Sequence, residues 1–137
     1  MNRTIKFRGI AVCNCEWVYG NYIHSKRFSG MGCEYRIHEQ DTGIESDIEP
    51  ETLGQFTGLY DKSGKEIYEG DILRANIRNE DMVFEVYYNV KHCLWQAKHK
   101  EIGETMALQN MFFRHSETEV IGNIHDNKEL LTLIEKQ

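Results

Sequence analysis

The chain has 137 residues, of which 40% are hydrophobic and 28% are charged, and its formal net charge is −6. This composition excludes a disordered tail, and the length predicts a single domain over residues 1–137. No segment is apolar over a membrane-spanning length, and the N-terminus lacks the apolar core of a signal peptide, so we expect a cytoplasmic protein without membrane contact.

The first elements along the chain are two strands, at about residues 4–12 and 16–24, which we expect to form an N-terminal hairpin within about residues 4–24. Aromatic side chains are expected to pack across this pair of strands. Lys6 and Arg8 share one side of the first strand. They offer a basic face that could bind nucleic acid together with exposed aromatic rings, or that is only solvated.

The turn of this hairpin contains two of the four cysteines. The full set is Cys13, Cys15, Cys33 and Cys93. Because no pair has the C-x-x-C spacing, we expect free thiols and neither a metal nor another cofactor. The alternative is a zinc site built from Cys13, Cys15, Cys33 and one histidine, which are suitable ligand types.

A glycine-containing loop at residues 29–32 leads to a predicted strand at residues 34–38. Gly30-x-Gly32 begins like a dinucleotide-binding fingerprint, but Tyr35 occupies the position of the third glycine and no βαβ pattern surrounds it. The segment that follows is acidic, since residues 40–71 carry nine acidic and two basic side chains. Such a segment repels phosphate backbones, so the sequence disfavours nucleic acid as a partner.

The stretch from Pro50 to Ala75 is the most specific part of the sequence. Asp61-Lys62-Ser63-Gly64 predicts a tight turn between two strands, because Asp can accept hydrogen bonds from the backbone ahead of it and Gly can adopt a positive φ. From residue 71 onward, apolar and polar side chains alternate as in a half-buried strand. We assign structural backbone roles, not ligand contacts, to Gly54, Gly58, Gly64, Gly70 and Asp71 of this stretch.

Further strands are predicted at residues 82–88, 93–97, 104–109 and 118–124. Closely spaced β segments favour a small barrel or sandwich, with its core at about residues 51–125, over a layered α/β fold. Asp126 lies three residues before Glu129, which is the spacing of a helix capping box. The sequence therefore predicts a mainly β, barrel-like fold with a short C-terminal helix at about residues 127–135.

Four blocks of the sequence carry a family resemblance. They are Ile5–Arg8, Trp17–Gly20, Gly54–Ile72 and Glu119–Asn127. In this order they resemble the YopX family of small proteins encoded by phages and prophages. The resemblance implies a β-rich, barrel-like fold in a bacterial host, and it supplies no catalytic positions because the family has no assigned reaction.

The sequence contains no nucleophile elbow, zinc-protease motif or P-loop, so we expect no enzyme. An active site assembled from distant histidines and carboxylates stays an alternative. The leading hypothesis is a protein that self-associates or binds a host or phage protein. Its basis is the content of seven Tyr, six Phe and two Trp, since aromatic side chains dominate the energetics of interfaces as well as of cores.

Overall fold

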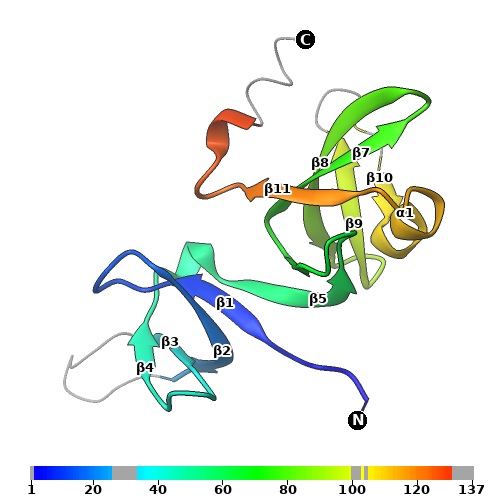
Figure 1. Cartoon of the computed structure of the whole chain (residues 1–137). Coiled ribbons are helices and arrows are strands. Elements are labelled where there is room, and N and C mark those ends of the chain that lie inside the picture. Colours follow the sequence, from blue (N-terminus) through cyan, green and yellow to red (C-terminus); the bar gives the residue numbers. More distant parts are fainter. Residues whose placement is uncertain (1, 26–33, 100–102, 104, 131–137) are drawn as a thin grey trace. The chain divides into compact units, whose positions relative to one another are not determined.

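The structure is a computed structural model that describes residues 2–25, 34–99, 103 and 105–130. The chain forms two compact units, Met1–Phe56 and Thr57–Gln137, which we call the N-terminal and C-terminal units (Figure 1). Each unit has its own cluster of buried apolar residues. That residues 1–137 form a single domain stays a prediction.

The N-terminal unit is an antiparallel sheet of short strands. Its elements are β1 (Phe7–Ile10), β2 (Trp17–His24), β3 (Tyr35–His38), β4 (Glu45–Asp47), the 3-10 helix η2 (Pro50–Thr52) and the start of β5 (Gly54–Tyr60). The strand order is β4-β3-β2-β1-β5. The predicted hairpin is confirmed, because β1 and β2 pair from Phe7 opposite Gly20 to Ile10 opposite Trp17. Phe7 and Tyr22 pack across it with ring centroids 5.6 Å apart.

The core of the N-terminal unit lies where the end of β4 returns to β1. The buried residues are Ala11, Val18, Ile37 and Ile48. An isolated antiparallel bridge joins Ala11 to Ile48, and the Glu49 N–H donates to the Ile10 carbonyl at 2.9 Å. Gly9 leaves room for this contact, since a Cβ there would lie 2.7 Å from Cδ1 of Ile48. Ile48 therefore fills space that the sequence keeps free in β1.

In the C-terminal unit, the end of β5 pairs with β6 (Glu66–Tyr68), and a second sheet has the order β10-β9-β8-β7-β11. The strands of this sheet are β7 (Asp71–Ile77), β8 (Glu80–Asn89), β9 (Leu94–His99), β10 (Thr105–Ala107) and β11 (Glu119–Asn123). The predicted alternation in β7 is confirmed from Leu73 to Asn76, because Leu73 and Ala75 are buried while Arg74 and Asn76 are exposed. Before Leu73 the pattern does not hold, since Asp71 and Ile72 are both buried.

One short helix, α1 (Leu108–Arg114), follows β10 directly. The sequence prediction of a strand over residues 104–109 is correct only for the part that forms β10. Leu108 and Met111 are three residues apart and fully buried in the core of the C-terminal unit. A seven-residue helix is marginal in water, so this burial stabilises α1.

A mainly β fold is confirmed, but a closed barrel is not. In the part of the chain that the structure describes, β10 and β11 are the two edges of the five-stranded sheet. Residues 128–130 are helical, and the rest of the predicted C-terminal helix lies outside the described residues. The residue directly before this turn is Asn127, whose Oδ1 accepts the Asn123 N–H at 3.1 Å. Asp126 instead accepts a hydrogen bond from the side-chain amide of Asn123.

Gly20 provides a test of the packing between β2 and β3. A Cβ at this position would lie against the backbone carbonyl of His38, well inside van der Waals contact, and the backbone cannot move aside without breaking the β2–β3 ladder. We expect Gly20→Ala to lower the free energy of unfolding by roughly 1–3 kcal/mol or more. Urea unfolding followed by circular dichroism measures the loss.

Gly43→Ala is the matched control, because a Cβ at Gly43 meets nothing within 4 Å, although its φ is +74°. It carries only the conformational cost of a positive φ, about 1 kcal/mol. An equal or larger loss for Gly43→Ala would contradict the steric role of Gly20.

Candidate functional site

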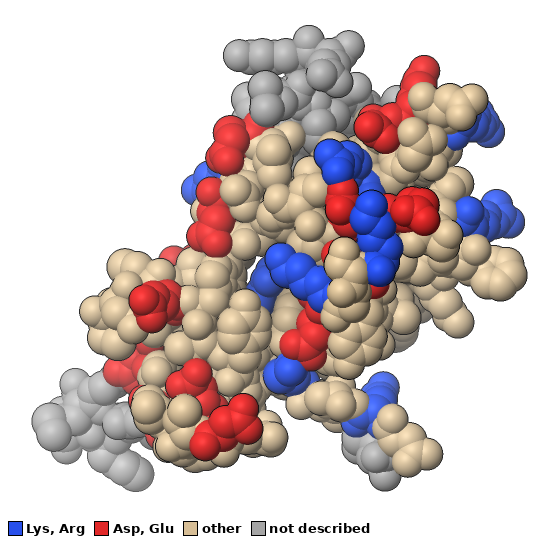
Figure 2. All heavy atoms as spheres, in the orientation of Figure 1, with Lys and Arg blue, Asp and Glu red and all other residues tan. Residues whose placement is uncertain are grey.

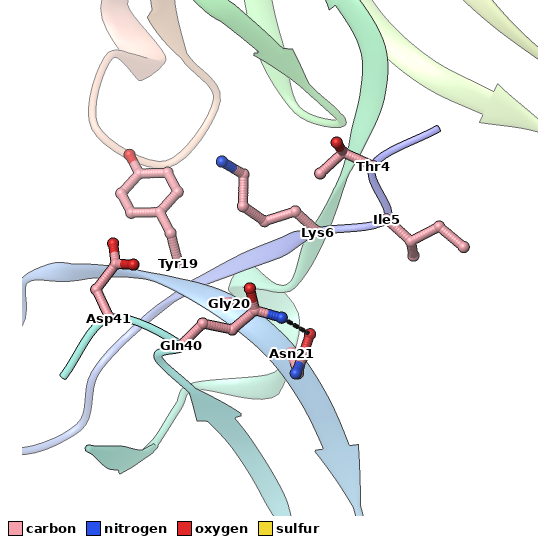
Figure 3. Close-up of a pocket in the computed structure, with 8 residues that line it drawn as sticks. All are labelled: Thr4, Ile5, Lys6, Tyr19, Gly20, Asn21, Gln40 and Asp41. Carbon is pink, nitrogen blue, oxygen red and sulfur yellow. Dashed lines mark hydrogen bonds between the residues drawn. The ribbon is translucent and has the colours of Figure 1, made fainter. Parts of the chain in front are cut away.

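The N-terminal unit has a polar surface hollow of about 430 Å³ (Figure 3). Its walls come from the segment before β1, from the middle of β2 and from the turn after β3. The lining residues are Thr4, Ile5, Lys6, Tyr19, Gly20, Asn21, Gln40 and Asp41. On one wall, the Gln40 side-chain amide donates to Oδ1 of Asn21 at 3.2 Å. The remaining amide groups of this pair suit hydrogen-bonding ligands.

The two basic residues proposed for nucleic acid lie in different environments. Lys6 lines the polar hollow, and its Nζ lies 5.9 Å from the ring centroid of Phe56. Arg8 is only 5% exposed, and its guanidinium lies 4.6 Å from the ring centroid of Trp17. Burial removes the Arg8 charge from the surface that a phosphate backbone would contact. Acidic side chains are prominent on the face of the N-terminal unit that Figure 2 shows.

The C-terminal unit has a different kind of hollow, with mostly apolar walls and a volume of about 310 Å³. Its lining comes from the end of β5, the start of β9 and the junction of β10 with α1. The residues are Thr57, Leu59, Cys93, Leu94, Trp95, Ala107, Leu108 and Gln109. The Trp95 ring is held edge-on by Tyr88, with centroids 4.9 Å apart at 65°. The hollow thus has an apolar wall that includes an aromatic ring in edge-on contact with a second ring.

Sequence reasoning missed the apolar hollow, although it placed a strand at residues 93–97. Leu108 reaches the wall only because α1 begins there, and α1 was not predicted. An apolar pair three residues apart, Leu108 and Met111, was the one sequence signal of that helix.

The four glycines in the stretch from Pro50 to Ala75 lie in turns or in strands. Gly64 (φ +82°) closes the turn after β5, and its N–H donates to the Asp61 carbonyl at 3.0 Å. Gly70 (φ +90°) precedes β7, donates to the Val86 carbonyl and accepts from the Ile124 N–H, both at 2.9 Å. The other two are Gly58, with φ +86°, and Gly54, which pairs with Arg8. The described glycines thus act in turns and strand pairing.

The two aspartates of this stretch are buried and hold the backbone. Asp71 is 2% exposed, and its Oδ2 accepts the Tyr68 N–H at 2.7 Å, which fixes the turn between β6 and β7. Asp61 is 8% exposed and accepts three backbone N–H groups. Its Oδ1 binds the N–H of Ser63 and of Lys65 at 2.9 Å, and its Oδ2 binds the Val120 N–H at 3.0 Å.

Burial alone would raise the pKa of Asp61, because it removes water from the carboxylate. The hydrogen bonds from Val120, Lys65 and Ser63, together with the charge of Lys65, outweigh burial and hold the pKa below its ordinary value. The carboxylate is therefore ionised at neutral pH. It joins the turn after β5 to β11, whose position in the sequence is 59 residues away.

The described residues form no metal centre. Within residues 2–25, 34–99, 103 and 105–130 there is no group of three or more His, Cys, Asp or Glu side chains that could hold a metal ion. Cys13, Cys15 and Cys93 are free and exposed, and Cys33 lies outside this part of the chain. Tyr22 and Asp61, whose pKa values are raised and lowered respectively, line neither hollow.

The described part of the chain contains no helix that is long and apolar enough to cross a bilayer.

Comparison with known proteins agrees with the family resemblance. The model of the YopX protein family matches residues 6–132. No curated protein matches the chain. Among solved structures, the chain is similar to protein EF1440 from Enterococcus faecalis, with 25% sequence identity and a TM-score of 0.58. The match covers 95% of this chain and 99% of that protein.

A substitution of Asp61 tests the turn at Asp61–Gly64. Asp61→Asn keeps the shape of the side chain but puts an amide in place of one acceptor oxygen. We expect it to lower the free energy of unfolding at pH 7 by roughly 1–3 kcal/mol, because a buried N–H loses its acceptor. Since folding lowers the pKa of Asp61, this stabilisation is complete above the unfolded-state pKa of about 3.9 and is lost as the pH falls through the folded-state pKa.

Urea unfolding at pH 7 and well below pH 4 measures both effects. The free energies of unfolding of the wild type and Asp61→Asn should converge in acid. Asp81→Asn is the control, because Asp81 is exposed and accepts only a side-chain hydrogen bond from Asn76. We expect a change within about 0.5 kcal/mol for this variant. Equal losses in the two variants would show that Asp61 has no special role.

Proposed function

We propose that this chain, which belongs to the YopX family, is a non-enzymatic module that binds another protein, either a further copy of itself or a host or phage protein. The observation that carries the proposal is the apolar hollow of the C-terminal unit, with the half-buried Leu59, Leu94 and Trp95 in its wall. Interfaces gain most of their binding energy where an aromatic or aliphatic side chain fills such a hollow.

Another apolar side chain of the C-terminal unit adds to this support, since Phe113 is 90% exposed. Single exposed apolar residues are common on protein surfaces, so they count less than the hollow itself. Nucleic acid has weaker support as the partner, because Arg8 is buried and the formal net charge is −6.

We also place the interaction in the cytoplasm of a bacterial host. Three exposed free cysteines suit a reducing compartment, where thiols do not form disulfides. The resemblance to a family encoded by phages and prophages supports a bacterial host.

The test uses variants of the apolar hollow. Leu94→Lys places a charge in its wall, while Val90→Lys places the same charge four residues away on the exposed turn before β9. Tagged wild-type and variant chains are expressed in phage-infected or lysogenic cells and cross-linked, and the captured proteins are identified by mass spectrometry. Light scattering of the purified chains measures self-association.

We expect the wild type and Val90→Lys to capture the same host or phage protein, and Leu94→Lys to capture at least about tenfold less of it. Circular dichroism confirms that each variant is folded. A wild-type chain that neither self-associates nor retains any protein would overturn the proposal. Equal binding by all three chains would exclude the hollow as the contact.

A further inference from the structure

Strand β2 extends beyond the end of its partner strand β1. The β1–β2 ladder ends at Phe7 opposite Gly20, whereas β2 continues to His24 and pairs with β3 along Asn21–His24. The chain before β1 runs away from β2 and lies beside β5 (Figure 1), where the Lys6 carbonyl accepts a hydrogen bond from the Phe56 N–H at 2.8 Å. Among the residues that the structure describes, the segment Asn21–His24, which we call the open β2 edge, therefore has a strand on only one side.

The phase of the two ladders shows which backbone groups this edge presents. The Ala11 N–H donates to the Glu16 carbonyl and the Ser25 N–H donates to the Glu34 carbonyl. Because hydrogen-bonded pairs alternate along an antiparallel ladder, even-numbered residues of β2 face β1 and odd-numbered residues face β3. Tyr22 and His24 thus direct their N–H and C=O groups to the side that β1 has left. Among the described residues, no backbone group accepts from or donates to them there.

The open β2 edge lacks the devices that usually protect a sheet edge. Its four residues include no Lys, no Glu, no Asp and no Pro. Native proteins place such residues, or a bulge, on exposed edges because unpaired strands pair with other chains. Moreover, Tyr22 and His24 are stacked at 14°, and His24 is stacked on Tyr35 at 9° with centroids 4.6 Å apart. The side chains beside the edge are therefore already ordered.

The edge is complementary to itself under a two-fold axis. When two copies align antiparallel with Ile23 on the axis, Tyr22 lies opposite His24 of the partner subunit, and His24 lies opposite Tyr22 of the partner subunit. Each of these pairs exchanges two backbone hydrogen bonds. The facing side chains are Ile with Ile and Tyr with His, so no like charges oppose each other at neutral pH.

We propose that the chain forms a two-fold dimer by antiparallel pairing of its open β2 edges, which joins the β4-β3-β2 strands of two copies into one continuous sheet. The inference deepens the proposed function, on which it rests, by naming a second copy as a partner. The contact involves few side chains and buries less than the roughly 1,200 Å² of a standard interface. The dimer therefore dissociates in the micromolar range or above.

The test compares two substitutions at one position. His24→Pro removes the N–H that faces the open side but no hydrogen bond to β3, and Pro is tolerated where the strand N–H faces solvent. His24→Ala removes the imidazole and keeps that N–H. Sedimentation velocity across the micromolar range measures the dissociation constant of each full-length chain, and circular dichroism measures its folding.

We expect His24→Pro to weaken the dimer at least about tenfold and His24→Ala to weaken it by much less. A wild-type chain that stays monomeric up to high micromolar concentration, or a dimer that His24→Pro leaves intact, would overturn the inference. If His24→Pro does not fold, amide hydrogen exchange of the wild type decides, because Tyr22 and His24 should gain protection with increasing concentration.

Leu94→Lys separates this inference from the proposed function. The variant should keep the dimer, because Leu94 lies in the other unit and the dimer uses only the open β2 edge. A monomeric wild type that still captures a host or phage protein would overturn the dimer and leave the proposed function standing. A dimer that is lost only in Leu94→Lys would place self-association at the apolar hollow instead.

Discussion

A desolvated carboxylate that must keep its charge organises the C-terminal unit. Asp61 is almost buried, and three backbone N–H groups compensate for the water that it has lost. Two of these donors come from its own turn, and the third, from Val120, comes from β11. The turn at Asp61 and the position of β11 beside β7 are therefore coupled. If either one changes, the buried carboxylate loses a hydrogen-bond donor.

The N-terminal unit depends on close steric contacts at two glycines. Gly9 and Gly20 each lack the Cβ that would collide with Ile48 or with the His38 carbonyl. Close approach at these two points lets a small set of residues, Ala11, Val18, Ile37 and Ile48, form a core. In this small sheet, β2 is longer than β1. A small sheet that ends its strands unevenly keeps unpaired backbone groups at its edge, and these groups favour association.

The two protein contacts that we propose, one in each unit, differ in kind. The open β2 edge offers directional backbone hydrogen bonds with little apolar area, whereas the hollow beside Trp95 offers apolar area with few hydrogen bonds. Strand pairing fixes geometry and tolerates many sequences, while an apolar pocket selects a side chain by shape. Under the two proposals, the chain pairs with its own copy at the open β2 edge and selects a different protein at the apolar hollow.

The sequence alone determined the mainly β class, the hairpin around Cys13 and Cys15, the turn at Asp61–Gly64 and the alternation of β7, because these features depend on local φ preferences and on the period of the side chains. Tertiary structure alone decided the rest. Helix α1 exists because Leu108 and Met111 find a core, Arg8 is buried although it alternates like a surface residue, and Asp61 meets Val120 only after folding. The hollow and the open edge belong to this second group, since each depends on where strands end relative to their neighbours, which no local pattern encodes.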